Sequence, residues 1–364
     1  MTDIDQKYMQ LALELAKATL GQTGHNPCVG AVIVKDNAVI ATGVHVKVGL
    51  PHAEIQALES AKVDLTGATL YVTLEPCCHT DKVTPPCTDA IIKSGIKKVV
   101  IATLDQNPKV SGHGAEILTK AGIDVVTAVL ENQAIQLNKR FFHFIQTSTP
   151  YITVKAGMSI DAKLATCKME SKWITNEETR NDSMWDRHSH DAILVGVNTV
   201  IHDNPKLTAR IPGNGKNPIR IILDTYLRTP LDAQVVNDGA APTWIITTKN
   251  VSADKIQQFN NKNVEFLILD ADTIEIPAVI SLLGKNGISS LLVEGGYTIH
   301  NSFIHHKKIN QLITYISPQL IGGENGLFQK MGFESLSQSL YGKFTQVTHL
   351  GDNLKIVIDF DEKE

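Results

Sequence analysis

Little in this sequence points to a secreted, membrane-spanning or nucleic-acid-binding protein. Its 364 residues include only five cysteines, an odd number that argues against a framework of disulfides. No apolar run reaches the roughly 18 residues of a membrane span. The formal net charge of −4 argues against a protein that binds nucleic acid through a basic surface stripe. Residues 1–21 predict an amphipathic helix rather than a signal peptide, so we expect a cytoplasmic protein.

Helix and strand patterns alternate along the chain, and its length fits two α/β domains of roughly 100–200 residues each. In the first domain, residues 1–145, strands are expected near 31–34, 39–41, 70–73, 99–102 and 123–126. Residues 141–149 end in Thr-Ser-Thr-Pro and predict a linker. In the second domain, residues 146–364, strands are expected near 151–155, 192–197, 219–223, 244–247, 266–269, 291–294, 312–316 and 354–358. Helices between several of them predict a mostly parallel sheet.

The clearest chemistry lies in four residues of the first domain: His52, Glu54, Cys77 and Cys87. One imidazole and two thiolates can hold Zn²⁺ with a fourth position open for water, while a nearby carboxylate moves protons. His52 and Glu54 are expected at the start of a helix, where their side chains diverge. Cys77 should end a strand, and Cys87 should begin a helix, where the helix dipole favours a thiolate. The sequence therefore predicts a hydrolytic zinc deaminase.

Other interpretations of this cluster stay open from the residues alone. Cys78 and His79 are competing zinc ligands, whereas Cys28 and Cys167 are interpreted as small buried hydrophobic residues. A nucleotide or tRNA-base deaminase whose second domain only binds RNA or a regulator is disfavoured by the acidic balance. A structural zinc site is disfavoured because such sites usually have four protein ligands and no use for Glu54.

The second half lacks the G-x-G-x-x-G fingerprint of a standard dinucleotide-binding fold. Glu294-Gly295-Gly296 ends a predicted strand and opens a helix, which would let backbone amides face a pyrophosphate. A tight turn that requires glycine explains the same residues equally well. These residues alone leave the function of the second half undecided.

Five short segments of the first half resemble the deaminase half of the bifunctional riboflavin-biosynthesis deaminase/reductases. They are HNPCVG at 25–30, PHAE at 51–54, TLEPC at 73–77, TPPC at 84–87 and DQNP at 105–108. Wide spacing between the zinc cysteines, ending in TPPC, is typical of that family. The chain departs from it at His25, where proline is usual, and in a longer loop that contains Asp81 and Val83.

This resemblance implies a cytidine-deaminase-like, three-layer α/β/α domain. It implies that His52, Cys77 and Cys87 bind one zinc ion and that Glu54 is the proton shuttle. It also places three residues beside the substrate: Asn26, Asp105 and Asn107.

The resemblance continues through the second half, in segments that include KAGMSID at 155–161, SKWIT at 171–175, DAILVG at 191–196, DNPKLT at 203–208 and VEGG at 293–296. That half of the family resembles dihydrofolate reductase in fold and uses NADPH. The implied cofactor contacts are Gly157, Trp173, Thr199, Asp203, Gly296, Tyr297, Thr298, Ile299, His300, Asn301 and Ser302. The implied substrate contacts are Ser171, Arg187, Leu207, Arg210 and Glu294.

The resemblance thus implies an enzyme with two reactions. It would deaminate 2,5-diamino-6-(5-phosphoribosylamino)pyrimidin-4-one with zinc, and then reduce the ribose of 5-amino-6-(5-phosphoribosylamino)uracil to a ribityl chain with NADPH. Lys155 and Asp203 are candidate proton donors for the reduction. We expect a homo-oligomer, dimer or tetramer, that binds a small-molecule substrate and neither nucleic acid nor membrane.

Overall fold

The computed structural model describes residues 2–78, 85–107, 111–213, 215–260, 262–328 and 332–360. The chain divides into two compact units, Met1–Ser148 and Thr149–Glu364, where the sequence analysis set the division after residue 145. His79, Asp81, Val83 and Pro108 lie outside the described residues. Within the described ranges, no helix combines the length and the apolar character needed to cross a membrane.

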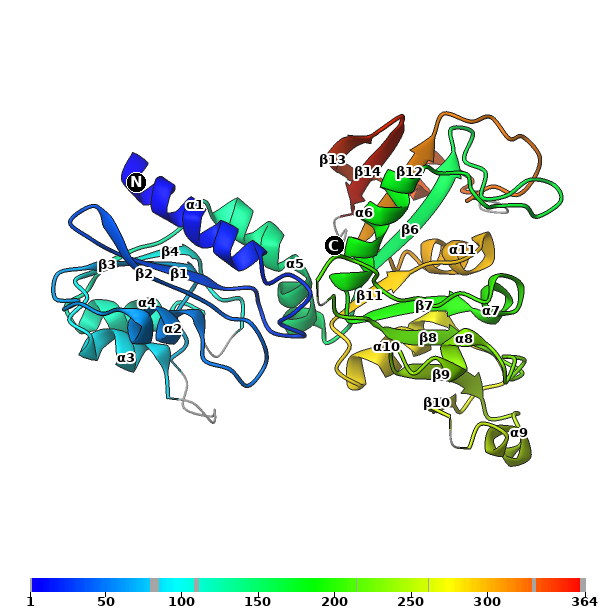
Figure 1. Cartoon of the computed structure of the whole chain (residues 1–364), viewed down its shortest axis with the longest axis horizontal. Coiled ribbons are helices and arrows are strands. Elements are labelled where there is room, and N and C mark those ends of the chain that lie inside the picture. The colour runs from blue at the N-terminus through cyan, green and yellow to red at the C-terminus, as the bar shows by residue number, and fades with distance from the viewer. Residues whose placement is uncertain are drawn as a thin grey trace. The chain divides into compact units, whose positions relative to one another are not determined.

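The first unit is built on a five-stranded sheet in the order β2-β1-β3-β4-β5 (Figure 1). Its strands are β1 (Gly30–Lys35), β2 (Ala38–Val44), β3 (Thr69–Leu74), β4 (Lys98–Thr103) and β5 (Asp124–Val126). β1 is antiparallel to both β2 and β3, whereas β3, β4 and β5 are parallel. Its helices are α1 (Asp3–Lys17), α2 (Ala53–Ser60), α3 (Cys87–Lys93), α4 (His113–Lys120) and α5 (Glu131–Thr147).

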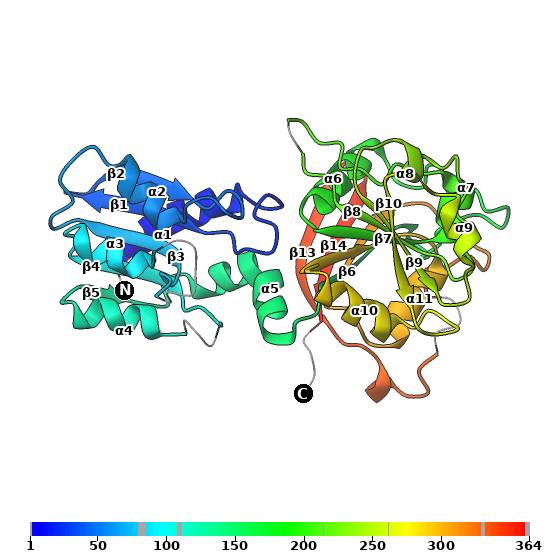
Figure 2. The same cartoon turned by 90° about the horizontal axis from the view of Figure 1, so that it is seen from below.

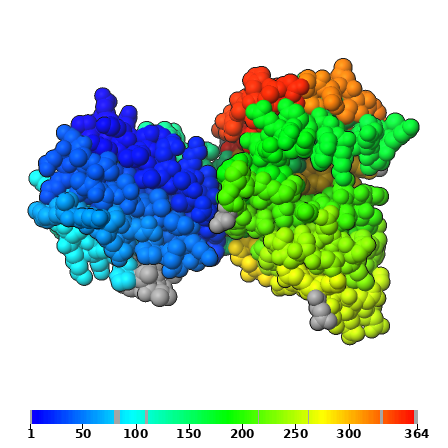
Figure 3. Space-filling model, in the orientation of Figure 1, coloured from blue at the N-terminus to red at the C-terminus, as the bar shows by residue number. Residues whose placement is uncertain are grey.

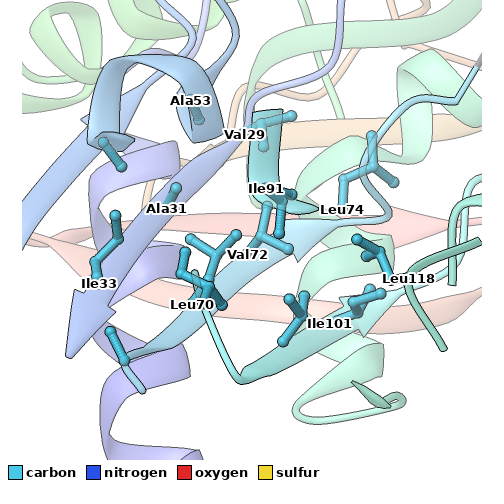
Figure 4. Packing of buried hydrophobic residues seen from close by; sticks show 14 of the residues in the cluster. Val29, Ala31, Ile33, Ala53, Leu70, Val72, Leu74, Ile91, Ile101 and Leu118 are labelled. Atoms are coloured by element: carbon cyan, nitrogen blue, oxygen red, sulfur yellow. The ribbon is translucent and has the colours of Figure 1, made fainter. Parts of the chain in front are cut away.

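Apolar spacing decides which face of the first sheet each helix covers. In α1 the buried residues recur at helical intervals, and Thr2 caps the helix by a reciprocal hydrogen bond with Asp5. Helices α2, α3 and α4 pack on the opposite face, where Ala53, Ile91 and Leu118 meet the inner strands (Figure 4). The result is the three-layer α/β/α arrangement that the sequence predicts.

Gly43 in β2 determines how closely α2 approaches the sheet. A Cβ at this position would overlap the backbone carbonyl oxygen of Ala53. Glycine therefore lets the first turn of α2 rest directly on β2, with His52 at the helix N-cap.

The second unit contains a nine-stranded sheet in the order β10-β9-β8-β7-β11-β6-β12-β14-β13 (Figures 1 and 2). Its strands are β6 (Tyr151–Ser159), β7 (Ala192–Gly196), β8 (Ile219–Leu223), β9 (Thr243–Thr248), β10 (Val264–Leu269), β11 (Ser290–Val293), β12 (Gln311–Ser317), β13 (Lys343–Leu350) and β14 (Asn353–Asp359). The strands from β10 to β12 along the sheet are parallel, and β14 and β13 add an antiparallel edge. The mostly parallel sheet is therefore confirmed.

Helices cover both faces of this second sheet. They are α6 (Glu177–His188), α7 (Val197–Asp203), α8 (Gln234–Asn237), α9 (Ala253–Gln257), α10 (Ile276–Lys285) and α11 (Tyr297–His305), with a 3₁₀ turn at Leu336–Gln338. α10 and α11 contribute to the apolar cluster on one face, and α7 and α8 to the cluster on the other. Strand β11 comes late in the chain yet lies between β7 and β6. The carboxyl ends of β7 and β11 therefore meet at one edge, where α7 and α11 begin.

Two expectations from the sequence are wrong, and one strand was not predicted. Residues 141–147 are not a linker but the last turns of α5, which continues to Thr147. Phe142 packs into the core and stabilises this part of the helix. Strand β13 was not anticipated, since its outer residues are mostly exposed and show no alternation. Cys28 is buried as expected, but Cys167 is exposed because it lies in the loop between β6 and α6.

Candidate functional site

Three predicted zinc ligands come together at the ends of three elements in the first unit. His52 precedes α2, Cys77 follows β3, and Cys87 is the first residue of α3. The Nδ1 atom of His52 lies 3.2 Å from Sγ of Cys87 and 3.5 Å from Sγ of Cys77. All three potential ligand atoms lie within 4.8 Å of one another, and both cysteines are buried. We call these three residues the zinc cluster.

The dimensions of the zinc cluster fit a tetrahedral ion. Zinc–sulfur bonds of about 2.3 Å and zinc–nitrogen bonds of about 2.0 Å require neighbouring ligand atoms roughly 3.5 Å apart. The backbone amide of Cys87 also donates to Sγ of Cys77 at 3.5 Å, which favours a thiolate there. Cys78 is not among the clustered atoms, so of the two adjacent cysteines only Cys77 belongs to the zinc cluster. Three protein ligands leave a fourth position for water, the pattern of a catalytic zinc site.

Glu54 is almost completely buried in the first turn of α2, two residues after His52. It lines the same cavity as His52 and Cys77, but its carboxylate is not one of the clustered ligand atoms. Burial raises the pKa of Glu54, and the positive charge of His52 opposes this rise. The carboxyl group thus lies in the same cavity as two residues of the zinc cluster without belonging to that cluster.

A cavity of about 240 Å³, the deaminase pocket, opens beside the zinc cluster. All three predicted substrate contacts of the first unit line it: Asn26, Asp105 and Asn107. His45 lines it too, and its Nε2 atom lies 3.0 Å from Nδ2 of Asn26. His45 was not among the predicted residues, although a histidine just beyond an apolar strand is a usable signal.

Glu75 organises one wall of the deaminase pocket and was also missed. Its buried carboxylate accepts hydrogen bonds from the backbone amides of Asp105, Gly112 and Ala115 at 3.1, 2.9 and 3.0 Å. It therefore fixes the loop after β4 that carries Asp105 and Asn107. Three more lining residues, Phe141, Phe144 and Ile145, come from the part of α5 that the sequence analysis assigned to a linker.

In the second unit, three charged residues distant in sequence form a buried ionic cluster. The Glu294 carboxylate accepts hydrogen bonds from Nε of Arg187 at 3.0 Å and from Nη2 of Arg187 at 2.9 Å. The Nζ atom of Lys155 lies 3.5 Å from Oε2 of Glu294. Burial alone would raise the pKa of Glu294, but Arg187 and Lys155 hold it well below its usual range. Arg210 lies beside this ionic cluster, where its Nη1 atom donates to Thr208 Oγ1 at 3.2 Å.

The carboxyl edge of the second sheet is shaped by glycines. Gly295 has a positive φ of 126°, and a Cβ there would lie 3.2 Å from Thr199 Oγ1. A Cβ at Gly196 would lie 3.0 Å from the side chain of Ile299. These glycines let α7 and α11 approach closely beside the strand ends, the position where open α/β sheets bind dinucleotides.

The remaining predicted residues of the second unit occupy different environments. Trp173 is exposed, and the guanidinium of Arg180 lies 4.4 Å from its ring centre, so Trp173 is not a core residue. Asp203 pairs with Lys172 at 3.7 Å, in the loop that contains Ser171. Leu207 and His300 are fully buried. Burial and the charge of Lys155 lower the pKa of His300 to about 4, against the opposing effect of Glu294.

Comparisons with known proteins cover nearly the whole chain. The cytidine and deoxycytidylate deaminase zinc-binding region matches residues 2–103, and the RibD C-terminal domain matches residues 150–356. The riboflavin biosynthesis protein RibD of Bacillus amyloliquefaciens is 46% identical over 97% of this chain and 95% of its own length. That of Aquifex aeolicus is 46% identical over 97% of this chain and 98% of its own length.

Solved structures agree with these sequence relationships. The diaminohydroxyphosphoribosylaminopyrimidine deaminase/5-amino-6-(5-phosphoribosylamino)uracil reductase of Thermotoga maritima superposes with a TM-score of 0.88 at 35% identity, covering 98% of this chain and 99% of its own. RibD of Acinetobacter baumannii gives a TM-score of 0.87 at 34% identity, covering 99% of each chain. The expected pair of folds, one like cytidine deaminase and one like dihydrofolate reductase, is confirmed.

Proposed function

The chain belongs to the bifunctional riboflavin-biosynthesis deaminase/reductase family, and on that premise we propose how its residues divide the two reactions. The first unit is the zinc-dependent deaminase, and the second is the NADPH-dependent reductase. The hypotheses of an RNA-binding second domain and of a purely structural zinc site are therefore discarded. The substrate that we propose is 2,5-diamino-6-(5-phosphoribosylamino)pyrimidin-4-one, whose deaminated product is then reduced.

In the deaminase unit, His52, Cys77 and Cys87 hold the zinc ion, which when bound lowers the pKa of its water to about 7. Glu54 accepts a proton from the attacking water and passes it to the ring nitrogen, then carries the remaining hydroxyl proton to the amino group, which leaves as ammonia. Asn26, Asp105 and Asn107 hold the polar edges of the pyrimidine. The observation that carries this proposal is that His52 and Cys77 of the zinc cluster, together with Glu54, line one cavity with all three polar residues.

In the reductase unit, NADPH is proposed to lie along the carboxyl edge, where Gly157, Thr199 and residues 296–302 border it. NADPH supplies the hydride, and the protein positions the open ribose against it. Lys155 is the proposed proton donor to the ribose oxygen, because its Nζ atom lies beside Glu294 in a nearly buried position. Arg187 has two of its donor groups committed to Glu294, so Arg210 is the better candidate for the substrate phosphate.

One set of assays on the full chain tests this division. Without NADPH, the diaminopyrimidine should be deaminated and the product should accumulate. A chelator that removes zinc should stop this step, while reduction of an already deaminated substrate continues. If the chelated protein loses both reactions equally while remaining folded, the separation into two independent sites is wrong.

We also infer a cytoplasmic homo-oligomer. No disulfide joins the five cysteines, all of which lie in the described ranges, and this fits a reducing compartment. The edge strand β13 exposes Phe344 and Val347 at the surface of the second unit, where the C-terminal hairpin is drawn in red (Figure 3). Light scattering after gel filtration tests the association: a mass of 39.7 kDa at micromolar concentration would identify a monomer and contradict it.

A further inference from the structure

Helix α5 changes course at Asn138, whose backbone leaves helical geometry at φ −109° and ψ 16°. Before this point, Ala134 and Leu137 pack in the same apolar cluster as α1. After it, Phe142 packs in the cluster on the opposite face of the sheet. Ile135, before the kink, already packs against this second cluster, so α5 contacts both clusters, and its last turns line the deaminase pocket.

The Asn138 side chain joins this kink to the loop before β1. Its Oδ1 atom accepts from the backbone amide of Cys28 at 2.8 Å, and its Nδ2 atom donates to the carbonyl oxygen of Cys28 at 3.0 Å. One buried amide thus satisfies both backbone groups of a residue 110 positions away in sequence. Asn26 and Pro27, which line the deaminase pocket, immediately precede Cys28.

The turns of α5 that follow the kink contribute apolar side chains to the same pocket. Phe141, Phe144 and Ile145 line it, and their spacing of three and four residues puts them on one helix face. The loop residues and the residues beside the metal are instead mostly polar. A planar heteroaromatic ring is recognised by hydrogen bonds at its edge and by apolar or aromatic contacts on its face. The pocket contains both kinds of wall, and Asn138 connects them.

We propose that the end of α5 is the wall that packs on the face of the pyrimidine ring. In this arrangement Phe144 determines specificity for a planar base, and Asn138 is the positioning residue that sets the spacing between this wall and Asn26. The inference rests on the proposed deaminase function of the pocket. It explains why the helix that ends the first unit belongs to its active site rather than to a connection between domains.

Phe144→Ala and Phe142→Leu in the full chain form a matched pair. Phe142 lies two residues away on the same helix but packs into the core and does not line the pocket. Loss of an aromatic stacking partner should raise the KM for deamination roughly 5- to 100-fold in Phe144→Ala. Zinc content, and reduction of an already deaminated substrate, should be unchanged. Phe142→Leu should lower the melting temperature without raising this KM.

Either of two results would overturn the role of Phe144. One is an unchanged KM in Phe144→Ala. The other is an equal rise of KM in Phe142→Leu, which would show that only the stability of α5 matters. If the unmodified enzyme does not deaminate the diaminopyrimidine at all, the proposed function itself fails, so the two failures are distinguishable.

Asn138 is tested by a double-mutant cycle with Phe144. Asn138→Ala should raise the KM for deamination when the variant is fully loaded with zinc. The double variant with Phe144→Ala should show a smaller rise in KM than the product of the two single rises. The non-additivity arises because a displaced wall has already lost much of its contact with the ring. The positioning role would be refuted if the two rises in KM simply multiply. It would also be refuted if Asn138→Ala loses deaminase activity only in proportion to its zinc content.

Discussion

The two units build their sites in opposite ways. In the first, the key residues lie within 36 positions of one another, at His52, Glu54, Cys77 and Cys87, each at or near the end of a helix or strand. In the second, Lys155, Arg187 and Glu294 become neighbours only because β11 enters the sheet between β7 and β6. A metal site assembled from successive elements leaves a readable motif in the sequence. A site assembled by sheet topology leaves scattered charges that only the fold brings together.

The two sites also differ in what holds them together. The zinc cluster is completed by an ion that binds strongly to ligands spaced as these are, so its chemistry depends on a few atoms. The ionic cluster of the reductase is already paired within the protein, because Glu294 accepts two hydrogen bonds from Arg187. A substitution in the first unit should therefore affect chemistry more than stability, whereas one in the second should affect both.

The largest effect should come from Cys77→Ser. Losing one of three protein ligands should release zinc and abolish deamination, whereas Cys78→Ser should keep both, since only Cys77 belongs to the zinc cluster. Metal content by atomic emission and ammonia release measure the two outcomes. Zinc loss in Cys78→Ser with retention in Cys77→Ser would show that the ligand register is shifted by one residue.

Glu54→Gln should be next in size. The variant should retain zinc and lose about 10²- to 10⁴-fold in kcat for deamination, because a glutamine cannot transfer protons. The reductase in the same chain provides the internal control and should be unaffected. A zinc-free Glu54→Gln protein would instead identify Glu54 as a ligand.

Arg187→Ala tests whether a substitution in the second unit affects stability as well as chemistry. Removing Arg187 leaves the buried carboxylate of Glu294 with Lys155 as its remaining ion-pair partner, which should cost about 3–5 kcal/mol. All three tryptophans, at 173, 185 and 244, lie in the second unit, so their fluorescence reports its unfolding selectively. Arg210→Ala is the control: it should raise the KM for the phosphorylated substrate and leave stability nearly unchanged. Equal stability of the two variants would contradict the structural part played by Arg187.

The smallest effect should be a pH dependence caused by His300. Above pH of about 6.5 this imidazole is neutral in the folded and unfolded chain and has no effect. As the pH falls toward 4, the unfolded chain binds a proton that the folded chain excludes, so the free energy of unfolding decreases by about 3 kcal/mol. His300→Leu should remove this part of the pH dependence in urea unfolding followed by tryptophan fluorescence. Parallel curves for the two proteins would show that His300 is accessible to protons in the folded state.

The same contrast explains how far the sequence could predict the structure. Long apolar runs such as those of β1 and β7 identified the inner strands, because a strand buried on both faces is hydrophobic throughout. Strand β13 could not be recognised, since it lies at the sheet edge and is mostly exposed. Glu75 and Phe144 were missed because each acts through neighbours that are remote in sequence, whereas His45 had a usable signal in its position just beyond a strand. The roles of Arg187 and Glu294 came from family resemblance, and their direct pairing emerged only in the fold.

The position of β11 has a consequence for synthesis of the chain on the ribosome. The first 148 residues contain every strand of their own sheet, so the deaminase unit can fold before most of the reductase has been made. The second sheet cannot form in chain order, because β6 and β7 both pair with β11, whose residues 290–293 are made much later. Nascent chains that stop before β11 would leave both edges of β6 and one edge of β7 unpaired, because β12 is made later still, and unpaired apolar edges are prone to aggregation. Interrupted synthesis should therefore yield a folded deaminase unit attached to an incomplete second unit that is prone to aggregate.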